Sequence, residues 1–143
     1  MLERVKQLLF IDKQPMFVFI MNQPFLTEFY LMILYGIPNC DTVRKARKFL
    51  SENNIQYTFH DFRKDGLTVS TIQHWLESQP IEALVNKRST SWKQITNKQQ
   101  TELMSGKNLE ILTELPTLIK RPVLETDTQL MLGFNAAEYE TLV

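Results

Sequence analysis

The residue best suited to covalent chemistry in this sequence is Cys40, the only cysteine of the chain. It follows an apolar, strand-like run and precedes a basic, helix-like run, so we expect it at a helix N-terminus. The amides and dipole there stabilise an anion and lower the pKa of a thiol. Thr42 can donate to the thiolate, and Arg44 can add positive charge. The polar neighbours Asn39 and Asp41 favour a reactive thiol over the alternative, a small apolar filler.

A single cysteine limits the redox chemistry that the chain can perform. It cannot form an intrachain disulfide, and Val43 stands where a CxxC motif would have its second cysteine. An outside thiol must therefore reverse any oxidation or adduct at Cys40. The sequence groups no ligands for zinc or another metal. One cysteine and no convincing export signal predict a reducing, cytoplasmic location.

Two basic pairs could bind an anion beside such a thiol. Lys87 and Arg88 follow a short helix-like run, and Lys120 and Arg121 directly precede Pro122. A proline that opens a strand beside a reactive thiol is a favourable place for a cis peptide bond. The alternative is that both pairs are solvated surface groups, which is the usual position of Lys and Arg.

Composition excludes several other classes of protein. The 143 residues include 16 Lys and Arg against 16 Asp and Glu, so a uniformly basic nucleic-acid binder is not indicated. We read residues 43–48, "VRKARK", as the solvated face of a helix.

Residues 1–31 are predicted to be a poorly ordered extension or the product of a wrong start site, and they lack the run of about 18 apolar residues of a membrane span. We expect one domain over 32–143, acting as a monomer.

The order of the predicted elements indicates a small α/β fold. A strand, a helix and a second strand form a βαβ unit, several helices follow, and a hairpin and a helix capped by Asn135 end the chain. This order predicts a thioredoxin-like fold, with a mixed four-stranded sheet and a helical insertion between its halves. The expected strands cover 32–35, 55–62, 117–126 and 129–134, and the expected helices cover 41–53, 65–78, 81–86 and 135–143. Residues 96–115 are expected to form one or two further helices, with Gly106 as a weak break.

Five ordered blocks carry a resemblance to a known family. They read "LYGIPNCDTVRKARKFL", "IQYTFHDFRKDGL", "ALVNKRSTSW", "LPTLIKRPVL" and "LGFN", and they span nearly all of residues 32–143. The chain resembles the arsenate reductase (ArsC)-related family, whose members have a thioredoxin-like fold. It is most similar to the Spx/YffB-type branch, and especially to YffB-like glutathione-dependent thiol reductases.

The resemblance implies roles for individual residues. Cys40 matches the nucleophilic cysteine of the family. Arg121 matches the arginine that precedes the cis-proline of the family, and Pro122 matches that proline. Arg88 matches the arginine of the N-x-R block. Glutaredoxin-coupled arsenate reductases place that arginine two positions earlier, where this chain has Asn86. They also carry a third arginine near the last strand, where this chain reads "LGFN". Both departures argue against arsenate as the substrate.

The expected function is a thiol-dependent oxidoreductase with Cys40 as nucleophile and glutathione, directly or through glutaredoxin, as reductant. No bound cofactor is expected, and the substrate would be a small anion or a disulfide. Arg88, Arg121, Arg44, Thr42 and Asn39 are predicted to bind it. Two alternatives remain: a non-catalytic regulator that binds the RNA polymerase α subunit as Spx does, and a genuine arsenate reductase.

Overall fold

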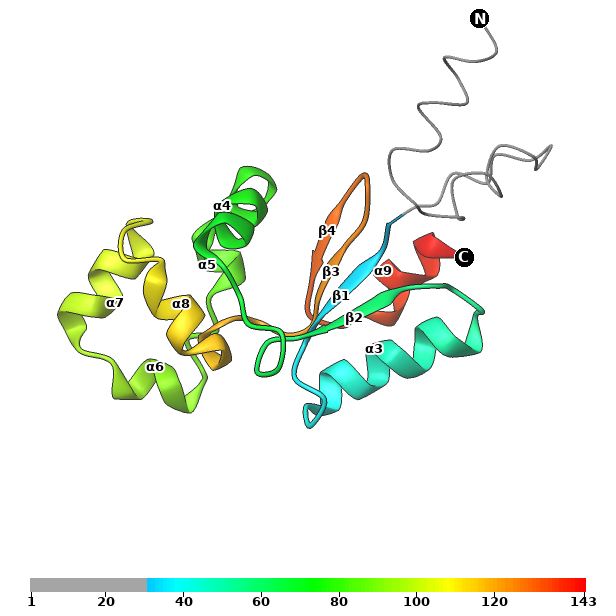
Figure 1. Cartoon of the computed structure of the whole chain (residues 1–143), viewed down its shortest axis with the longest axis horizontal. Helices are drawn as coiled ribbons and strands as arrows, with labels where there is room; N and C mark the ends of the chain where they lie inside the picture. Colours follow the sequence, from blue (N-terminus) through cyan, green and yellow to red (C-terminus); the bar gives the residue numbers. More distant parts are fainter. Residues whose placement is uncertain (1–30) are drawn as a thin grey trace, which may run out of the picture.

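The computed structural model describes residues 31–143, so the predicted extension over 1–31 lies outside the described residues except for Leu31. Its centre is a four-stranded sheet in the order β2-β1-β3-β4 (Figure 1). β1 runs parallel to β2, whereas β3 runs antiparallel to both β1 and β4. The predicted parallel pair and hairpin are therefore confirmed, and the fold is thioredoxin-like. The strands are β1 (Ile33–Gly36), β2 (Thr58–Asp61), β3 (Val123–Glu125) and β4 (Leu130–Leu132).

Alternation along the short strands gives the sheet two apolar faces. Leu34, Leu124 and Met131 belong to one buried cluster with residues of α3 (Asp41–Glu52) and α9 (Ala136–Tyr139). Tyr35 and Val123, one position along their strands, belong to the second cluster, which the helical insertion completes. The sheet is thus covered by α3 and α9 on one face, while Trp75 of α4 packs against the other.

Helix α3 forms because its apolar residues recur at helical spacing. Val43, Ala46 and Leu50 are buried, while the basic residues between them face the solvent. The helix passes so close to β1 that a Cβ on Gly36 would lie 2.8 Å from Cγ2 of Val43. A side chain at position 36 would therefore clash with Val43 in the first turn of α3.

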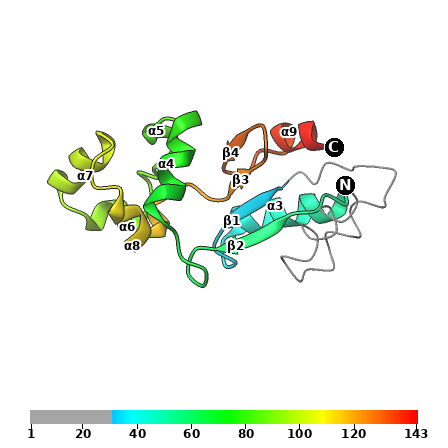
Figure 2. The same ribbon diagram turned by 45° about the horizontal axis from the view of Figure 1, so that its top comes forward.

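The insertion is a group of short helices beside one end of the sheet (Figures 1 and 2). Hydroxyl side chains cap several of them: Thr68, Ser89 and Thr96 accept hydrogen bonds from backbone amides in the first turn of α4, α6 and α7. The elements are α4 (Val69–Ser78), α5 (Ile81–Leu84), α6 (Thr90–Gln94), α7 (Asn97–Met104), α8 (Glu110–Glu114) and the 3₁₀-helix η1 (Pro116–Leu118).

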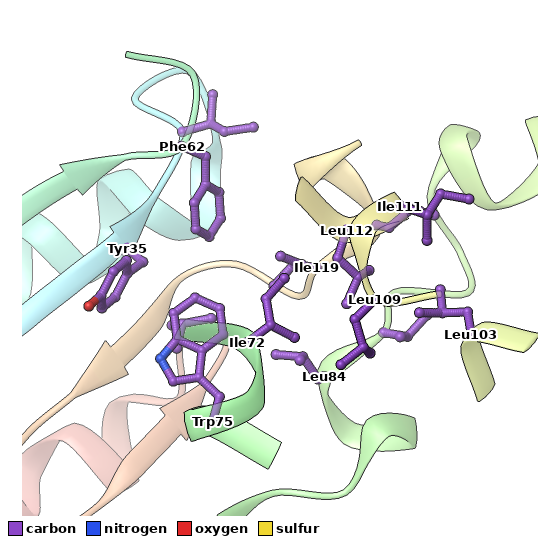
Figure 3. Packing of buried hydrophobic residues seen from close by; sticks show 14 of the residues in the cluster. Tyr35, Phe62, Ile72, Trp75, Leu84, Leu103, Leu109, Ile111, Leu112 and Ile119 are labelled. Carbon is purple, nitrogen blue, oxygen red and sulfur yellow. The ribbon is translucent and has the colours of Figure 1, made fainter. Parts of the chain in front are cut away.

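An aromatic group joins the insertion to the sheet. Figure 3 shows Trp75 of α4 facing Tyr35 of β1 and Phe62, and the rings of Tyr35 and Trp75 meet edge to face at 4.9 Å between centroids. The indole Nε1 of Trp75 also donates to Glu125 of β3 at 3.1 Å. Gln79, just after α4, donates to the Leu130 carbonyl of β4 at 3.0 Å. These contacts fix α4 against the hairpin.

Several predicted boundaries were wrong. The strand expected over 117–126 is divided into η1 and a strand that begins only at Val123, because Pro122 has no amide hydrogen to donate to a neighbouring strand. The second strand begins at Thr58 rather than at 55, α6 was not predicted, and the last helix continues as the 3₁₀-helix η2 (Glu140–Leu142). Asn135 does cap α9, through a hydrogen bond from the amide of Ala137. Within residues 31–143, no helix is long and apolar enough to cross a membrane.

Candidate functional site

Cys40 is the N-cap residue of α3, as the sequence predicted. Its backbone is extended, with φ −116° and ψ 128°, and its carbonyl accepts the first helical hydrogen bond, from the amide of Arg44. The thiol is partly buried, so a small reagent can reach it. The turn that precedes the helix thus presents the sulfur beside the free amides of the first helical turn.

The surroundings of Cys40 lower the pKa of its thiol. Partial burial acts in the opposite direction, but the hydroxyl of Thr42, the backbone amide of Val43, the charge of Arg121 and the amide of Thr42 together outweigh it. The Cys40 side chain makes no cap hydrogen bond in the structure, and the nearby amides lower the pKa by favouring the charged form of the thiol. A lowered pKa means a larger thiolate fraction at neutral pH, and the thiolate is the nucleophilic form of cysteine.

Thr42 connects the thiol to the loop that contains the cis-proline. Its Oγ1 lies 3.1 Å from Sγ of Cys40 and donates to the backbone carbonyl of Arg121 at 3.0 Å. The Arg121–Pro122 peptide bond is cis, as predicted. Because a hydroxyl has a single proton, Thr42 cannot donate to the carbonyl and to a thiolate at the same time.

A short backbone bridge brings the two basic pairs to the same place. Val85 and Ile119 form an isolated antiparallel bridge. The amide of Asn86 donates to the Leu118 carbonyl at 2.6 Å, and the amide of Lys120 donates to the Leu84 carbonyl at 2.8 Å. Segments 84–86 and 118–120 are therefore held side by side, so the basic pair that follows the first segment and the pair at the end of the second line the same cleft.

These residues line a cleft of about 630 Å³ that opens beside the thiol. Four of its side chains carry positive charge and one carries negative charge. Among residues 31–143, no ion pair within 4.0 Å involves any of these five groups. The side chains that line the cleft therefore carry an excess of positive charge. Its lining residues are Cys40, Thr42, Glu82, Val85, Asn86, Lys87, Arg88, Lys120, Arg121 and Gly133.

The structure brings together only some of the predicted binding residues. Cys40, Thr42, Arg88 and Arg121 line the cleft, and the buried Pro122 follows directly in the chain. Two others do not line it: Arg44 is exposed and forms an ion pair with Asp41, and Asn39 is an exposed turn residue.

Sequence reasoning missed four residues that line the cleft. Glu82, Val85 and Asn86 come from α5 and the bridge that follows it, and Gly133 comes from the "LGFN" block. Gly133 has a φ of +81°, a value that favours glycine, and its amide donates to the Pro122 carbonyl at 2.8 Å. Position next to the N-x-R block was the only signal that could have pointed to Glu82.

The described residues contain no group of three or more His, Cys, Asp and Glu side chains that could hold a metal ion. Both histidines are engaged with neighbours. His60 Nε2 lies 2.6 Å from the Gly66 carbonyl, and His74 contacts Glu77 and Glu125.

Comparison with known proteins gives a consistent set of relatives. The model of the ArsC family matches residues 35–142. An uncharacterized protein of Haemophilus influenzae is 41% identical over 110 residues, which is 77% of this chain and 96% of that protein. The solved structure of a YffB protein is 32% identical, with a TM-score of 0.72 over 77% of this chain and 96% of its own.

A regulator is also among the relatives. The global transcriptional regulator Spx of Lactiplantibacillus plantarum is 26% identical over 110 residues, which is 76% of this chain and 83% of that protein. The matches cover the sheet, the insertion and the segments around the thiol. The chain therefore belongs to the ArsC family, in the branch that contains Spx and the YffB-like proteins.

Proposed function

We propose that this protein is a thiol-dependent oxidoreductase that uses Cys40 as a single nucleophile and glutathione as its reductant. The observation that carries the proposal is the position of Cys40. Its sulfur lies at a helix N-terminus, where its pKa is lowered, and opens onto a cleft with four positive side chains. Glutathione carries a thiol and two carboxylates, so it matches both features. The lone thiol fits a reducing, cytoplasmic setting.

The proposed reaction consists of two thiol–disulfide exchanges. In the first, the Cys40 thiolate attacks a mixed disulfide between glutathione and a substrate thiol, forms a disulfide with the glutathionyl sulfur and releases the substrate thiolate. In the second, a glutathione thiolate attacks that sulfur, forms oxidised glutathione and releases the Cys40 thiolate. Each step breaks one sulfur–sulfur bond and forms another. Glutathione supplies the electrons, directly or through glutaredoxin, so no second cysteine is needed.

The charged side chains of the cleft have a binding role in this reaction. Arg88 and Arg121 offer planar, forked donors that suit carboxylates, and Lys87 and Lys120 add compact charges beside them. Arg121 also acts on the chemistry, because its charge helps to lower the pKa of Cys40. The same residue thus attracts the anionic reagent and stabilises the nucleophile.

Mass spectrometry of the intact protein after exposure to oxidised glutathione tests the proposal. We expect one glutathionyl group on the wild-type chain, located at Cys40 and removed by reduced glutathione. The Cys40→Ser variant controls for the location. No adduct under conditions where iodoacetamide alkylates Cys40 would contradict the proposal, because the thiol would then be accessible but unable to exchange with glutathione.

The 26% sequence identity with an Spx regulator supports a second candidate, a regulator that binds the RNA polymerase α subunit. Val43 excludes a CxxC switch of its own but not binding. Purified α subunit would be retained by the immobilised chain if this candidate is correct, and the Cys40→Ser variant would retain it equally well. Failure to retain the subunit would exclude this role.

Arsenate is the remaining candidate substrate, because the cleft attracts anions of any kind. An assay coupled to glutathione and glutaredoxin separates it from the disulfide. Turnover with arsenate would identify an arsenate reductase. Turnover with a glutathionylated thiol alone would support the thiol reductase.

A further inference from the structure

Glu82 stands out in the cleft because it is the only carboxylate among four cations. It lies in the first turn of the short helix α5, is exposed, and lines the same space as Lys87, Arg88 and Lys120. No ion pair within 4.0 Å joins Glu82 to any cation of the described chain. The structure therefore presents a negative group that its positive neighbours do not neutralise by contact.

A carboxylate in this place works against the binding of a simple anion. It reduces the positive potential of the cleft and repels any ligand oxygen that approaches it. A ligand that also carries a positive group can form an ion pair with this carboxylate, which offsets the repulsion. The charge pattern of the cleft therefore fits a zwitterion that has more carboxylates than ammonium groups.

We infer that Glu82 binds the free α-ammonium group of a γ-glutamyl thiol, while the cations of the cleft bind its carboxylates. This inference rests on the proposed function and specifies how the thiol is recognised. Glutathione has one ammonium and two carboxylates, so its charges pair with Glu82 and with cations such as Arg88 and Arg121. Thiols without an ammonium group, or with an acylated one, leave Glu82 unpaired in the complex.

The recognition is selective because only a ligand without a free ammonium group leaves the Glu82 carboxylate desolvated and unpaired. When an N-acylated analogue occupies the cleft, Glu82 loses part of its hydration without gaining a partner. Glu82 is therefore a specificity-determining residue that contacts the ligand at the end away from the reacting sulfur. It does not take part in the exchange of sulfur–sulfur bonds.

Equilibrium binding of S-methylglutathione, which has no free thiol, tests the inference without turnover. NMR titration of the wild-type chain, Glu82→Gln and Glu82→Asp would be compared, with N-acetyl-S-methylglutathione as the second ligand. We expect Glu82→Gln to bind S-methylglutathione about two- to fivefold more weakly, the range of an exposed ion pair. The N-acetylated ligand should bind Glu82→Gln more tightly than the wild type, because the penalty of the unpaired carboxylate is removed, and Glu82→Asp should retain part of the preference for the free amine.

A matched control keeps the result specific. Glu110→Gln removes an exposed carboxylate from the first turn of α8, outside the cleft, and should bind both ligands as the wild type does. Unchanged or tighter binding of S-methylglutathione by Glu82→Gln would overturn the inference and leave the proposed function standing. Equal weakening of both ligands would also overturn it, since Glu82 would then act on the shape of the cleft. Failure of wild-type Cys40 to form a glutathione adduct would instead overturn the proposed function.

Discussion

The hydroxyl of Thr42 donates a hydrogen bond of 3.0 Å to the backbone carbonyl of Arg121, the residue that precedes the cis-proline. The same oxygen lies 3.1 Å from the sulfur of Cys40. When Cys40 is a thiol, its proton can point to Thr42, whose own proton points to the carbonyl. When Cys40 ionises, we expect the Thr42 proton to turn to the sulfur and the carbonyl to lose its partner. The charge on Cys40 would then be linked to a backbone group 81 residues along the chain.

Replacing Thr42 by valine should raise the pKa of Cys40. Valine has the shape of threonine but no hydroxyl, so the thiolate loses the largest of the interactions that lower its pKa. Thr42→Ser retains the hydroxyl and is the matched control. The ultraviolet absorbance of the thiolate, followed against pH, measures the change. Identical titrations of Thr42→Val and the wild type would show that the Thr42 proton stays on the Arg121 carbonyl in both states.

Alkylation of Cys40 should persist to lower pH in the folded chain than in the unfolded chain. The folded pKa is lowered, so the thiolate remains populated as the pH falls below about 8.5, the ordinary pKa of a cysteine. The rate then drops as the pH falls through the folded pKa. Rates of reaction with iodoacetamide, measured across pH with and without urea, provide the comparison within one molecule. Coincident profiles would contradict the account of the site.

Removing a positive charge from the cleft should slow the attack of Cys40 on anionic disulfides. We expect Arg88→Gln to react with oxidised glutathione about two- to fivefold more slowly, since one exposed ion pair contributes about 0.2–1 kcal/mol. Its rate with uncharged hydroxyethyl disulfide should not change. The exposed Arg63, outside the cleft, gives the matched control Arg63→Gln.

The double variant of Arg88→Gln with Arg121→Gln should lose more of the rate, and added salt should affect it less than the wild type. Arg121 contributes twice, through the charge of the cleft and through the pKa of Cys40. Titration of the thiolate in the double variant separates the two effects. An equal loss of rate with both disulfides at a pH where Cys40 is fully ionised would show that these arginines do not bind the reagent.

Gly36→Ala should destabilise the fold by about 1–3 kcal/mol, the usual cost of overpacking a buried site. The added Cβ would lie 2.8 Å from Cγ2 of Val43, and Val43 is itself fully buried. Urea unfolding measures the loss. In the double variant Gly36→Ala with Val43→Ala, the two costs should fall short of their sum, because the smaller side chain admits the new methyl group. Strict additivity would mean that the two residues do not compete for space.

The sequence predicted most of the sheet because its strands and α3 show clear local periodicity. Residues 43, 46 and 50 recur at helical spacing, and two apolar runs near the C-terminus are separated by a polar turn. Errors arose where backbone chemistry rather than side-chain pattern decides. The apolar run 117–119 suggested a strand, but Pro116 starts a 3₁₀-helix there and Pro122 delays the strand.

The site was predictable at the thiol and less so around it. A cysteine between a strand and a helix is a local pattern that predicts a thiol of lowered pKa. The cleft instead depends on the bridge between Val85 and Ile119, which are distant in sequence. No local pattern encodes that pairing. Arg44 shows the opposite case: its spacing from Cys40 suggested a role, but the closer acidic neighbour Asp41 engages it.

Val43, which packs against Gly36, occupies the position that a second cysteine would need, and this determines how the proposed reaction depends on the glutathione pool. A dithiol protein with a CxxC motif has its second cysteine at this position, whereas this chain has the buried side chain of Val43 packed against β1. A dithiol exchanging with glutathione consumes one oxidised and releases two reduced molecules, so its oxidised fraction varies with the total concentration of glutathione. A lone thiol exchanges one for one, so its modified fraction depends only on the ratio of oxidised to reduced glutathione. Dilution of the pool at constant ratio would leave the modified fraction of this protein unchanged.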